Sequence, residues 1–96
     1  MEPKKLSEKG LATALKGLAG WKIVDGKLGR EFKFKDFSEA FAFMTRVALA
    51  AESMNHHPDW SNAYNQVKIE LVTHSAGGVT PNDIDLAHHI NKISSS

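Results

Sequence analysis

The sequence predicts an α+β fold in which helices cover one face of a four-stranded antiparallel sheet. Helical periodicity recurs in three segments, and the two stretches between them alternate apolar with polar residues. Each of these stretches is divided by a short turn, as in a β-hairpin. The predicted order is therefore helix, hairpin, helix, hairpin, helix. Because 96 residues without a linker suit one domain, residues 1–96 are expected to form a single domain.

The first helix and hairpin are expected between residues 7 and 35. Ser7 can cap the helix and Gly20 can end it. The apolar face of this helix carries Leu11, Ala14, Leu15 and Leu18. The segment WKIVDGKLGREFKF is expected to be a hairpin, because Asp25-Gly26 suits a type I′ turn. After this turn phenylalanines alternate with lysines, so one face of the hairpin is apolar and the other solvated.

The strongest helical pattern is the segment DFSEAFAFMTRVALAAESMN, where Asp36 and Glu39 resemble a capping box. It carries more apolar residues than one buried stripe needs. One face, assigned to the sheet, has Phe37, Phe41, Met44, Ala48 and Ala51. A second face, assigned to a partner subunit, has Phe43, Val47, Ala50 and Met54. The alternative is that both faces merge into one broad stripe. The pattern favours a homo-oligomer.

The second hairpin and the last helix follow a proline. Pro58 stops the long helix and should leave His57 extended. The segments WSNAY, NQ and VKIELVTH predict a hairpin, with Val67, Ile69, Leu71 and Thr73 on one face. Thr80, Pro81 and Asp83 predict the cap, first position and capping box of the last helix. Its inward residues are expected to be Ile84, Ala87, Ile90 and Ile93.

Composition excludes several classes of function. The chain has no cysteine, which rules out disulfides, thiol catalysis and cysteine metal sites. A net charge of +1, with lysines spread along the first part of the chain, does not favour direct nucleic-acid binding. No apolar run approaches the roughly 20 residues that span a bilayer. The first ten residues lack the apolar core of a signal peptide, so a cytoplasmic location is expected.

Three of the five histidines are candidates for chemistry. His56 and His57 lie at a corner between helix and strand, His74 ends a predicted strand, and Glu52 lies one helical turn before His56. These four side chains could converge at one end of the sheet, where sites are usually built. They fit either a histidine metal site or metal-free acid/base catalysis. Adjacent histidines in an extended segment point to opposite sides, which favours acid/base catalysis.

The other two histidines, His88 and His89, lie away from the apolar positions of the last helix and are expected at the surface.

The spacing of seven residues resembles a family signature. Glu52 is followed after three residues by His56-His57-Pro58, after five by Tyr64, after nine by His74 and after eight by Asp83. This pattern resembles that of the pterin-4a-carbinolamine dehydratases. The segment FKFKDFSEAFAFMTRVALAAE is also similar to the family's central hairpin and helix. The resemblance runs from about Trp21 to the last helix.

The resemblance implies a reaction without metal or other cofactor. The family removes water from the 4a-hydroxylated tetrahydropterin that aromatic amino acid hydroxylases release, and gives quinonoid dihydropterin. By resemblance, His56, His57 and His74 form the catalytic set. His56 and His74 would transfer protons, and His57 would mainly hold the pterin. Glu52 and Asp83 would orient imidazoles or bind the polar edge of the substrate.

Other positions are expected to line the pocket. Trp60 could form a wall, and backbone groups near Asn55, Val72 and Thr73 could pair with the pyrimidine ring. For Tyr64 core packing is expected. Asp83 could serve as helix cap and site residue together.

The resemblance also implies assembly and partners. The family's central helices form a bundle of four chains, so a dimer or tetramer is expected. Animal relatives bind a homeodomain transcription factor and stabilise its dimer. The alternative function is therefore a binding module that acts as a transcriptional coactivator through the central helix. A histidine metal protein is the third possibility.

Overall fold

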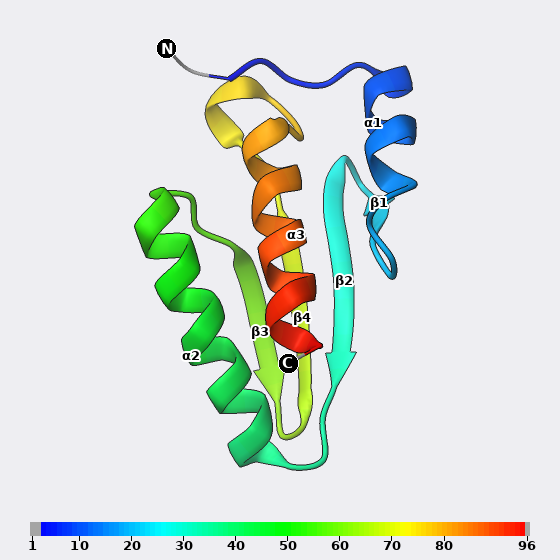
Figure 1. Cartoon of the computed structure of the whole chain (residues 1–96). Helices are drawn as coiled ribbons and strands as arrows, with labels where there is room; N and C mark the ends of the chain where they lie inside the picture. Colours follow the sequence, from blue (N-terminus) through cyan, green and yellow to red (C-terminus); the bar gives the residue numbers. More distant parts are fainter. Residues whose placement is uncertain (1–2, 96) are drawn as a thin grey trace.

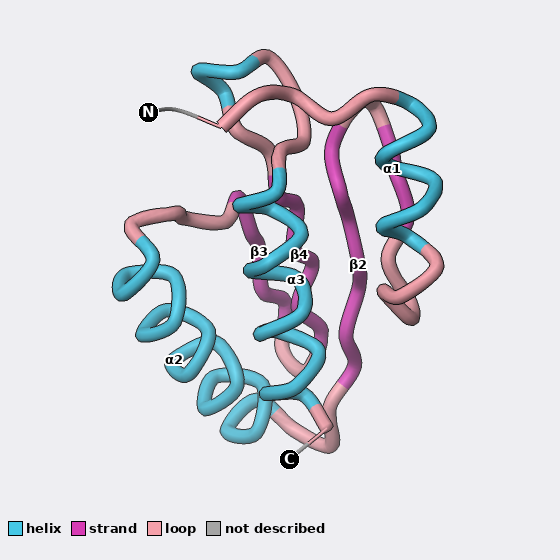
Figure 2. The backbone as a smooth tube through the Cα atoms, turned by 45° about the horizontal axis from the view of Figure 1, so that its top comes forward, coloured by secondary structure: helices cyan, strands magenta, loops and turns pink. Residues whose placement is uncertain are grey.

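The computed structural model describes residues 3–95 and has the predicted order of elements. The helices are α1 (Glu8–Leu15), α2 (Phe37–Met54) and α3 (Pro81–Ser94), with a short 3-10 helix η1 (His74–Ala76) before α3. The strands are β1 (Lys22–Val24), β2 (Lys27–Lys33), β3 (Asp59–Ala63) and β4 (Gln66–Leu71). They form a four-stranded sheet in the order β1-β2-β4-β3, antiparallel throughout. The helices cover one face of this sheet, so the predicted α+β fold is confirmed (Figures 1 and 2).

The core lies between the sheet and the helices. Alternate residues of β4 are buried, and they pair in register with Leu28, the half-buried Arg30 and Phe32 of β2, so the face of the sheet toward the helices is mostly apolar. The buried side chains of these two strands are Leu28, Phe32, Val67, Ile69 and Leu71. Leu86, Ala87 and Ile90 of α3 are fully buried against them. No helix of residues 3–95 is long and apolar enough to cross a membrane.

The local sequence signals act as predicted at several boundaries. Ser7 accepts a hydrogen bond from the Gly10 backbone N–H at 3.0 Å and caps α1. Asp25 and Gly26 have φ values of 52° and 77°, the positive values that a type I′ turn requires. Asp36 caps α2 by accepting from the Glu39 N–H at 2.8 Å.

The buried stripe of α2 combines residues from both predicted faces, with Ala51 from the face assigned to the sheet and Phe43 and Val47 from the other. Phe43 and Val47, which were assigned to a partner subunit, are 2% and 0% exposed and belong to the core. Phe37 and Phe41, which were assigned to the sheet, are 49% and 55% exposed. Phe43 contacts the rings of Phe32 and Phe34 with both centroids at 4.8 Å, and this aromatic cluster fixes the rotation of the helix. The buried stripe is Ala40, Phe43, Val47 and Ala51.

The second hairpin turns one residue earlier than predicted. Tyr64 and Asn65 form the turn, and Tyr64 has a φ of 53°. Tyr64 is 64% exposed, so the expectation that it packs in the core is wrong. The strand also ends earlier, at Leu71, and His74 begins η1 rather than ending a strand.

Helix α3 is anchored near its C-terminal end by Asn91. The Asn91 Oδ1 accepts from Trp21 Nε1 and from Arg30 Nη1, both at 2.6 Å. The Asn91 Nδ2 donates to the Ala19 carbonyl at 3.2 Å. Burial lowers the pKa of the Arg30 guanidinium from its usual value. These bonds join α3 to β2 and to the loop after α1, and so hold the helix that carries Asp83.

Candidate active site

The histidine pair lies where α2 ends and β3 begins. Asn55 caps α2 in the left-handed conformation, with a φ of 51°, which turns the chain sharply after the helix. His56 and His57 follow directly, and Pro58 separates them from β3. His56 is half-buried and His57 is exposed, so the two rings have different surroundings, as expected for adjacent residues outside a helix.

Asp83 is the buried centre of the site. Its side chain is 0% exposed and lies in the first turn of α3. Oδ1 is 2.5 Å from His56 Nε2, and Oδ2 accepts from the Thr80 backbone N–H at 2.8 Å and from Thr73 Oγ1 at 2.9 Å. Asp83 therefore closes the capping box of α3 and contacts an imidazole at the same time, the double role that the sequence allowed.

This arrangement assigns the protons. An ionised carboxylate only accepts hydrogen bonds, so with Asp83 in that form the shared proton is carried by His56 Nε2. Thr73 gives its single hydroxyl proton to Asp83, so Thr80 donates to Thr73 across the 2.8 Å between the two hydroxyl oxygens. The His56 Nδ1 is then the ring nitrogen left for a substrate.

Each of the other two candidate histidines also meets a carboxylate. His57 Nε2 is 2.7 Å from Glu52 Oε1, with side-chain exposures of 58% and 79%. His74 Nε2 is 3.5 Å from Asp59 Oδ2, with exposures of 76% and 51%. Glu52 was a predicted partner of an imidazole. Asp59 was not, although it directly follows His56-His57-Pro58 in the sequence.

Side-chain contacts and two short stretches of chain join His56 to His74 in a closed loop, called the circuit of contacts below. His56 contacts Asp83, and Asp83 accepts from Thr73, which directly precedes His74. His74 contacts Asp59, which lies three residues after His56. The two histidines are therefore held at the same end of the sheet, where β3 begins and the chain leaves β4.

The remaining predicted residues surround this circuit. Asn55 is exposed directly before His56, and Val72 is half-buried shortly before His74. Thr73 is 9% exposed, and its hydroxyl is occupied by Asp83 and Thr80. Trp60 is half-buried and packs against the core from β3.

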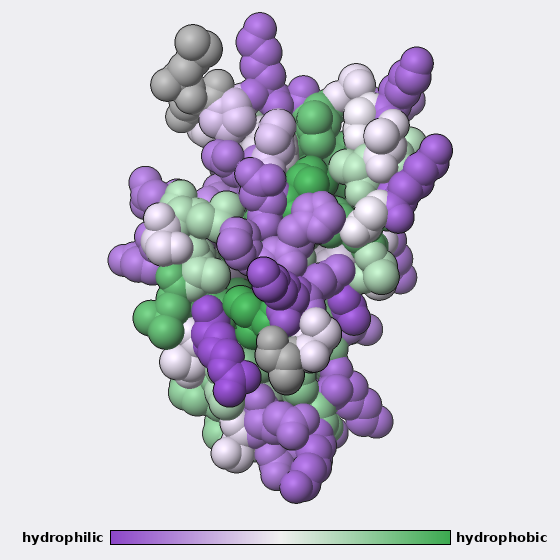
Figure 3. Space-filling view, in the orientation of Figure 1, coloured by the Kyte–Doolittle hydropathy of each residue, from purple (hydrophilic) through white to green (hydrophobic). Residues whose placement is uncertain are grey.

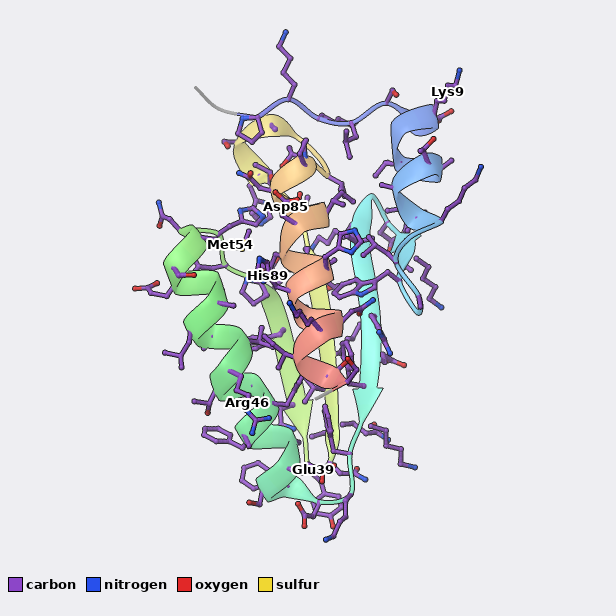
Figure 4. The ribbon with its side chains drawn as sticks, viewed as in Figure 1. Lys9, Glu39, Arg46, Met54, Asp85 and His89 are labelled. Atoms are coloured by element: carbon purple, nitrogen blue, oxygen red, sulfur yellow. The ribbon has the colours of Figure 1, made fainter. Side chains whose placement is uncertain are left out.

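His88 and His89 are exposed on α3, as predicted, and lie outside the circuit. They line a surface pocket with Met54, Asp85 and Lys92. Figure 4 shows Met54 at the end of α2 facing His89 and Asp85 of α3. Among residues 3–95, no three His, Asp or Glu side chains are grouped as ligands of one metal ion.

Comparison with known proteins shows the family of the chain. A sequence profile described as pterin 4 alpha carbinolamine dehydratase matches residues 4–93. The chain belongs to the pterin-4a-carbinolamine dehydratase family. The resemblance seen in the histidine spacing is therefore confirmed, and it covers nearly the whole chain.

Similar proteins match this chain over most of its length and most of their own. A protein of Solibacter usitatus, named after the family's dehydratase, is 52% identical over 89 residues, which cover 93% of this chain and 94% of the relative. A similarly named protein of a Synechococcus species is 58% identical over 76 residues, covering 79% and 82% of the two chains. A crystal structure from Brucella melitensis, described as a transcriptional coactivator/pterin dehydratase, is 51% identical with a TM-score of 0.90 and covers 94% of this chain and 98% of its own.

Proposed function

We propose that the protein dehydrates 4a-hydroxytetrahydropterin to quinonoid dihydropterin and water. The observation that carries the proposal is the buried contact between His56 and Asp83 at two positions of the family signature. A carboxylate that holds one ring nitrogen fixes the tautomer and leaves the other nitrogen for proton transfer. This arrangement suits an acid/base enzyme.

The reaction requires two proton transfers. The hydroxyl on carbon 4a leaves as water once it is protonated, and N5 loses its proton as the double bond between C4a and N5 forms. One histidine, protonated as imidazolium, donates to the hydroxyl and becomes neutral, while a neutral imidazole accepts the proton of N5, so no net proton is consumed. His56 and His74 are the proposed pair, because the circuit of contacts holds both at one end of the sheet.

The surrounding residues would bind the pterin. His57, held by Glu52, is proposed to contact the ring, and the backbone at Asn55 and Val72 is proposed to pair with the pyrimidine edge. Asp83 and Thr73 would act through His56, because their polar side-chain atoms are occupied by one another and by Thr80. Trp60 would close one wall.

The direct test is turnover without metal. Protein dialysed against a strong chelator is added to freshly generated 4a-hydroxytetrahydropterin, and quinonoid dihydropterin is followed by absorbance. We expect a protein-dependent rate well above the uncatalysed rate, unchanged by the chelator. Absence of any acceleration would overturn the proposal. A rate that the chelator abolishes and zinc restores would instead favour a histidine metal protein.

The exposed face of α2 is proposed to bind a second copy of the chain. Phe37 and Phe41 contact each other, with ring centroids 5.7 Å apart, and Leu49 on the same helix is 68% exposed. Figure 3 shows apolar atoms gathered over the α2 side of this view. Such a patch on a small chain favours association, and a dimer or a tetramer would cover it.

Replacing Phe41 with glutamate is expected to reduce the oligomer mass, because a charge would be placed in an apolar interface. The fold should survive, since Phe41 is 55% exposed within one chain. Light scattering and thermal unfolding measure the two effects. Val24→Glu, which changes an exposed apolar residue on β1, should keep the native mass. A wild-type protein that is monomeric at micromolar concentration would refute the assembly.

Transcriptional coactivation is the second candidate function. The similar chain from Brucella melitensis is described as both coactivator and dehydratase. The same α2 face could bind a regulatory protein in place of a second copy. A stable complex with a dimerising regulator that Phe41→Glu abolishes, with no pterin turnover by the wild type, would favour this function over catalysis.

A further inference from the structure

We propose that Asp59 is a positioning residue for His74, which deepens the proposed function. Asp59 lies outside the family signature described above. Its Oδ2 is 3.5 Å from His74 Nε2 and 3.8 Å from Lys27 Nζ. The three side chains come from β3, η1 and β2, so the contact joins three elements.

The arrangement repeats that of the other two histidines. In all three pairs the Nε2 atom of the ring faces a carboxylate oxygen, from Asp83, Glu52 or Asp59. A carboxylate at Nε2 favours the tautomer that carries its proton there, and leaves the Nδ1 lone pair free to accept a proton, which the imidazolium can then return from Nδ1. His74 therefore presents the same ring nitrogen to a substrate as His56 does.

His74 needs such a partner more than His56 does. Its side chain is 76% exposed and lies in a 3-10 helix of three residues, so packing does not hold the ring. Asp59 is the first residue of β3 and pairs in register with Glu70 of β4, which fixes its backbone. The 3.5 Å separation is long for a hydrogen bond, but contacts of this kind commonly tighten when substrate binds.

Lys27 supports the carboxylate rather than the imidazole. Its Nζ approaches the same Oδ2 atom of Asp59 that faces His74. The Lys27 ammonium group therefore helps to hold in place the carboxylate oxygen that faces the ring. Lys27, Asp59 and His74 form a row in which the carboxylate lies between the ammonium group and the imidazole.

The first test measures the tautomer of His74 without substrate. Nitrogen-15 chemical shifts of the neutral ring should show a larger fraction of the Nε2–H form in the wild type than in Asp59→Ala. Asp59→Ala should move the ratio toward the mixture of an unrestrained imidazole, and Asp59→Glu should retain most of the bias. Glu70→Gln, which changes the cross-strand neighbour of Asp59, should leave the ratio unchanged. Equal ratios in the wild type and Asp59→Ala would overturn the proposal.

The second test measures turnover. Asp59→Ala should lower kcat by about 2- to 5-fold, the modest loss expected for an exposed pair, with little change in KM because Asp59 does not touch the substrate. Asp59→Glu should recover most of the rate. A fall in rate without a change in the tautomer ratio would also overturn the positioning role. Because the tautomer measurement needs no pterin, failure of the pair and failure of the dehydratase proposal are distinguishable.

Discussion

Replacing His56 or His74 with alanine is expected to lower turnover of 4a-hydroxytetrahydropterin by roughly 10²-fold or more, the usual loss on removing a general acid or base. The two changes should act on different proton transfers, one at the leaving hydroxyl and one at N5. The double variant should therefore fall well below either single variant. Initial rates of quinonoid dihydropterin formation, corrected for the uncatalysed reaction, measure the effect.

The two variants should differ in stability. His74 is 76% exposed and contacts only an exposed carboxylate, so His74→Ala should keep the wild-type melting temperature. The His56 side chain is 12% exposed and bonded to the fully buried Asp83. His56→Ala removes one hydrogen bond to a charged group, which costs about 1.5–3 kcal/mol. Its loss of activity must therefore be measured at a temperature where circular dichroism shows a folded protein.

A matched control variant shows whether the rate falls because of these two positions or because any exposed histidine has been removed. His88 is exposed on α3, outside the circuit of contacts that joins His56 and His74. His88→Ala should keep the wild-type rate and stability. Near wild-type rates in both His56→Ala and His74→Ala would remove these residues from the mechanism, whatever the double variant shows.

The parts of the fold that could be predicted are those fixed by neighbouring residues. Asp25-Gly26 determines its turn because both positions need positive φ, and few other residue pairs tolerate this. Thr80, Pro81 and Asp83 begin α3 because each satisfies a local requirement of a helix N-terminus. Such signals need no knowledge of the rest of the chain, so the order of elements follows from them.

The rotation of α2 could not be predicted in this way. Both of its faces are apolar, and periodicity alone does not say which of them meets the sheet. The choice depends on Phe43 fitting between Phe32 and Phe34, residues that the sequence places on the first hairpin. Phe41, which is exposed, is therefore a residue of α2 that can contact a second copy, and the buried Val47 is not. A charge at Val47, which is 0% exposed, would unfold the chain rather than separate subunits.

The sequence predicted the candidate histidines, but it did not predict all of the carboxylates beside them. The signature spacing predicted His56, His57 and His74 with Glu52 and Asp83 as possible partners, and in the structure each histidine lies beside a carboxylate, of which only that of Asp59 was not predicted. Asp59 was missed because the pairing of β3 with β4 and the turn of η1 bring it to His74. Backbone groups near Thr73 were expected to pair with the pyrimidine ring, but the Thr73 N–H donates to the Gly78 carbonyl, and the Thr73 carbonyl accepts from the Ala76 and Gly78 N–H groups.

Asp83→Asn is expected to reduce both stability and turnover, because this one side chain is both helix cap and imidazole partner. The amide has one acceptor oxygen in place of two, while three donors converge on the native carboxylate. If the NH₂ group replaces Oδ2, it faces the Thr80 N–H and the Thr73 hydroxyl, which are both donors. If it replaces Oδ1, it faces His56 Nε2, which can pair with it only after the ring changes tautomer. We expect a loss of about 2 kcal/mol or more, which lowers the melting temperature by roughly 10 °C in a domain of this size.

Turnover by Asp83→Asn should fall by roughly 10²-fold or more even where the variant is fully folded. An amide that donates to His56 Nε2 favours the tautomer with the proton on Nδ1, which is the wrong nitrogen for the proposed role. Asp85→Asn changes an exposed carboxylate two residues further along α3 and should leave rate and melting temperature unchanged. If Asp83→Asn lost stability but kept the wild-type rate in its folded form, Asp83 would be a helix cap alone, and the tautomer of His56 would not matter for the reaction.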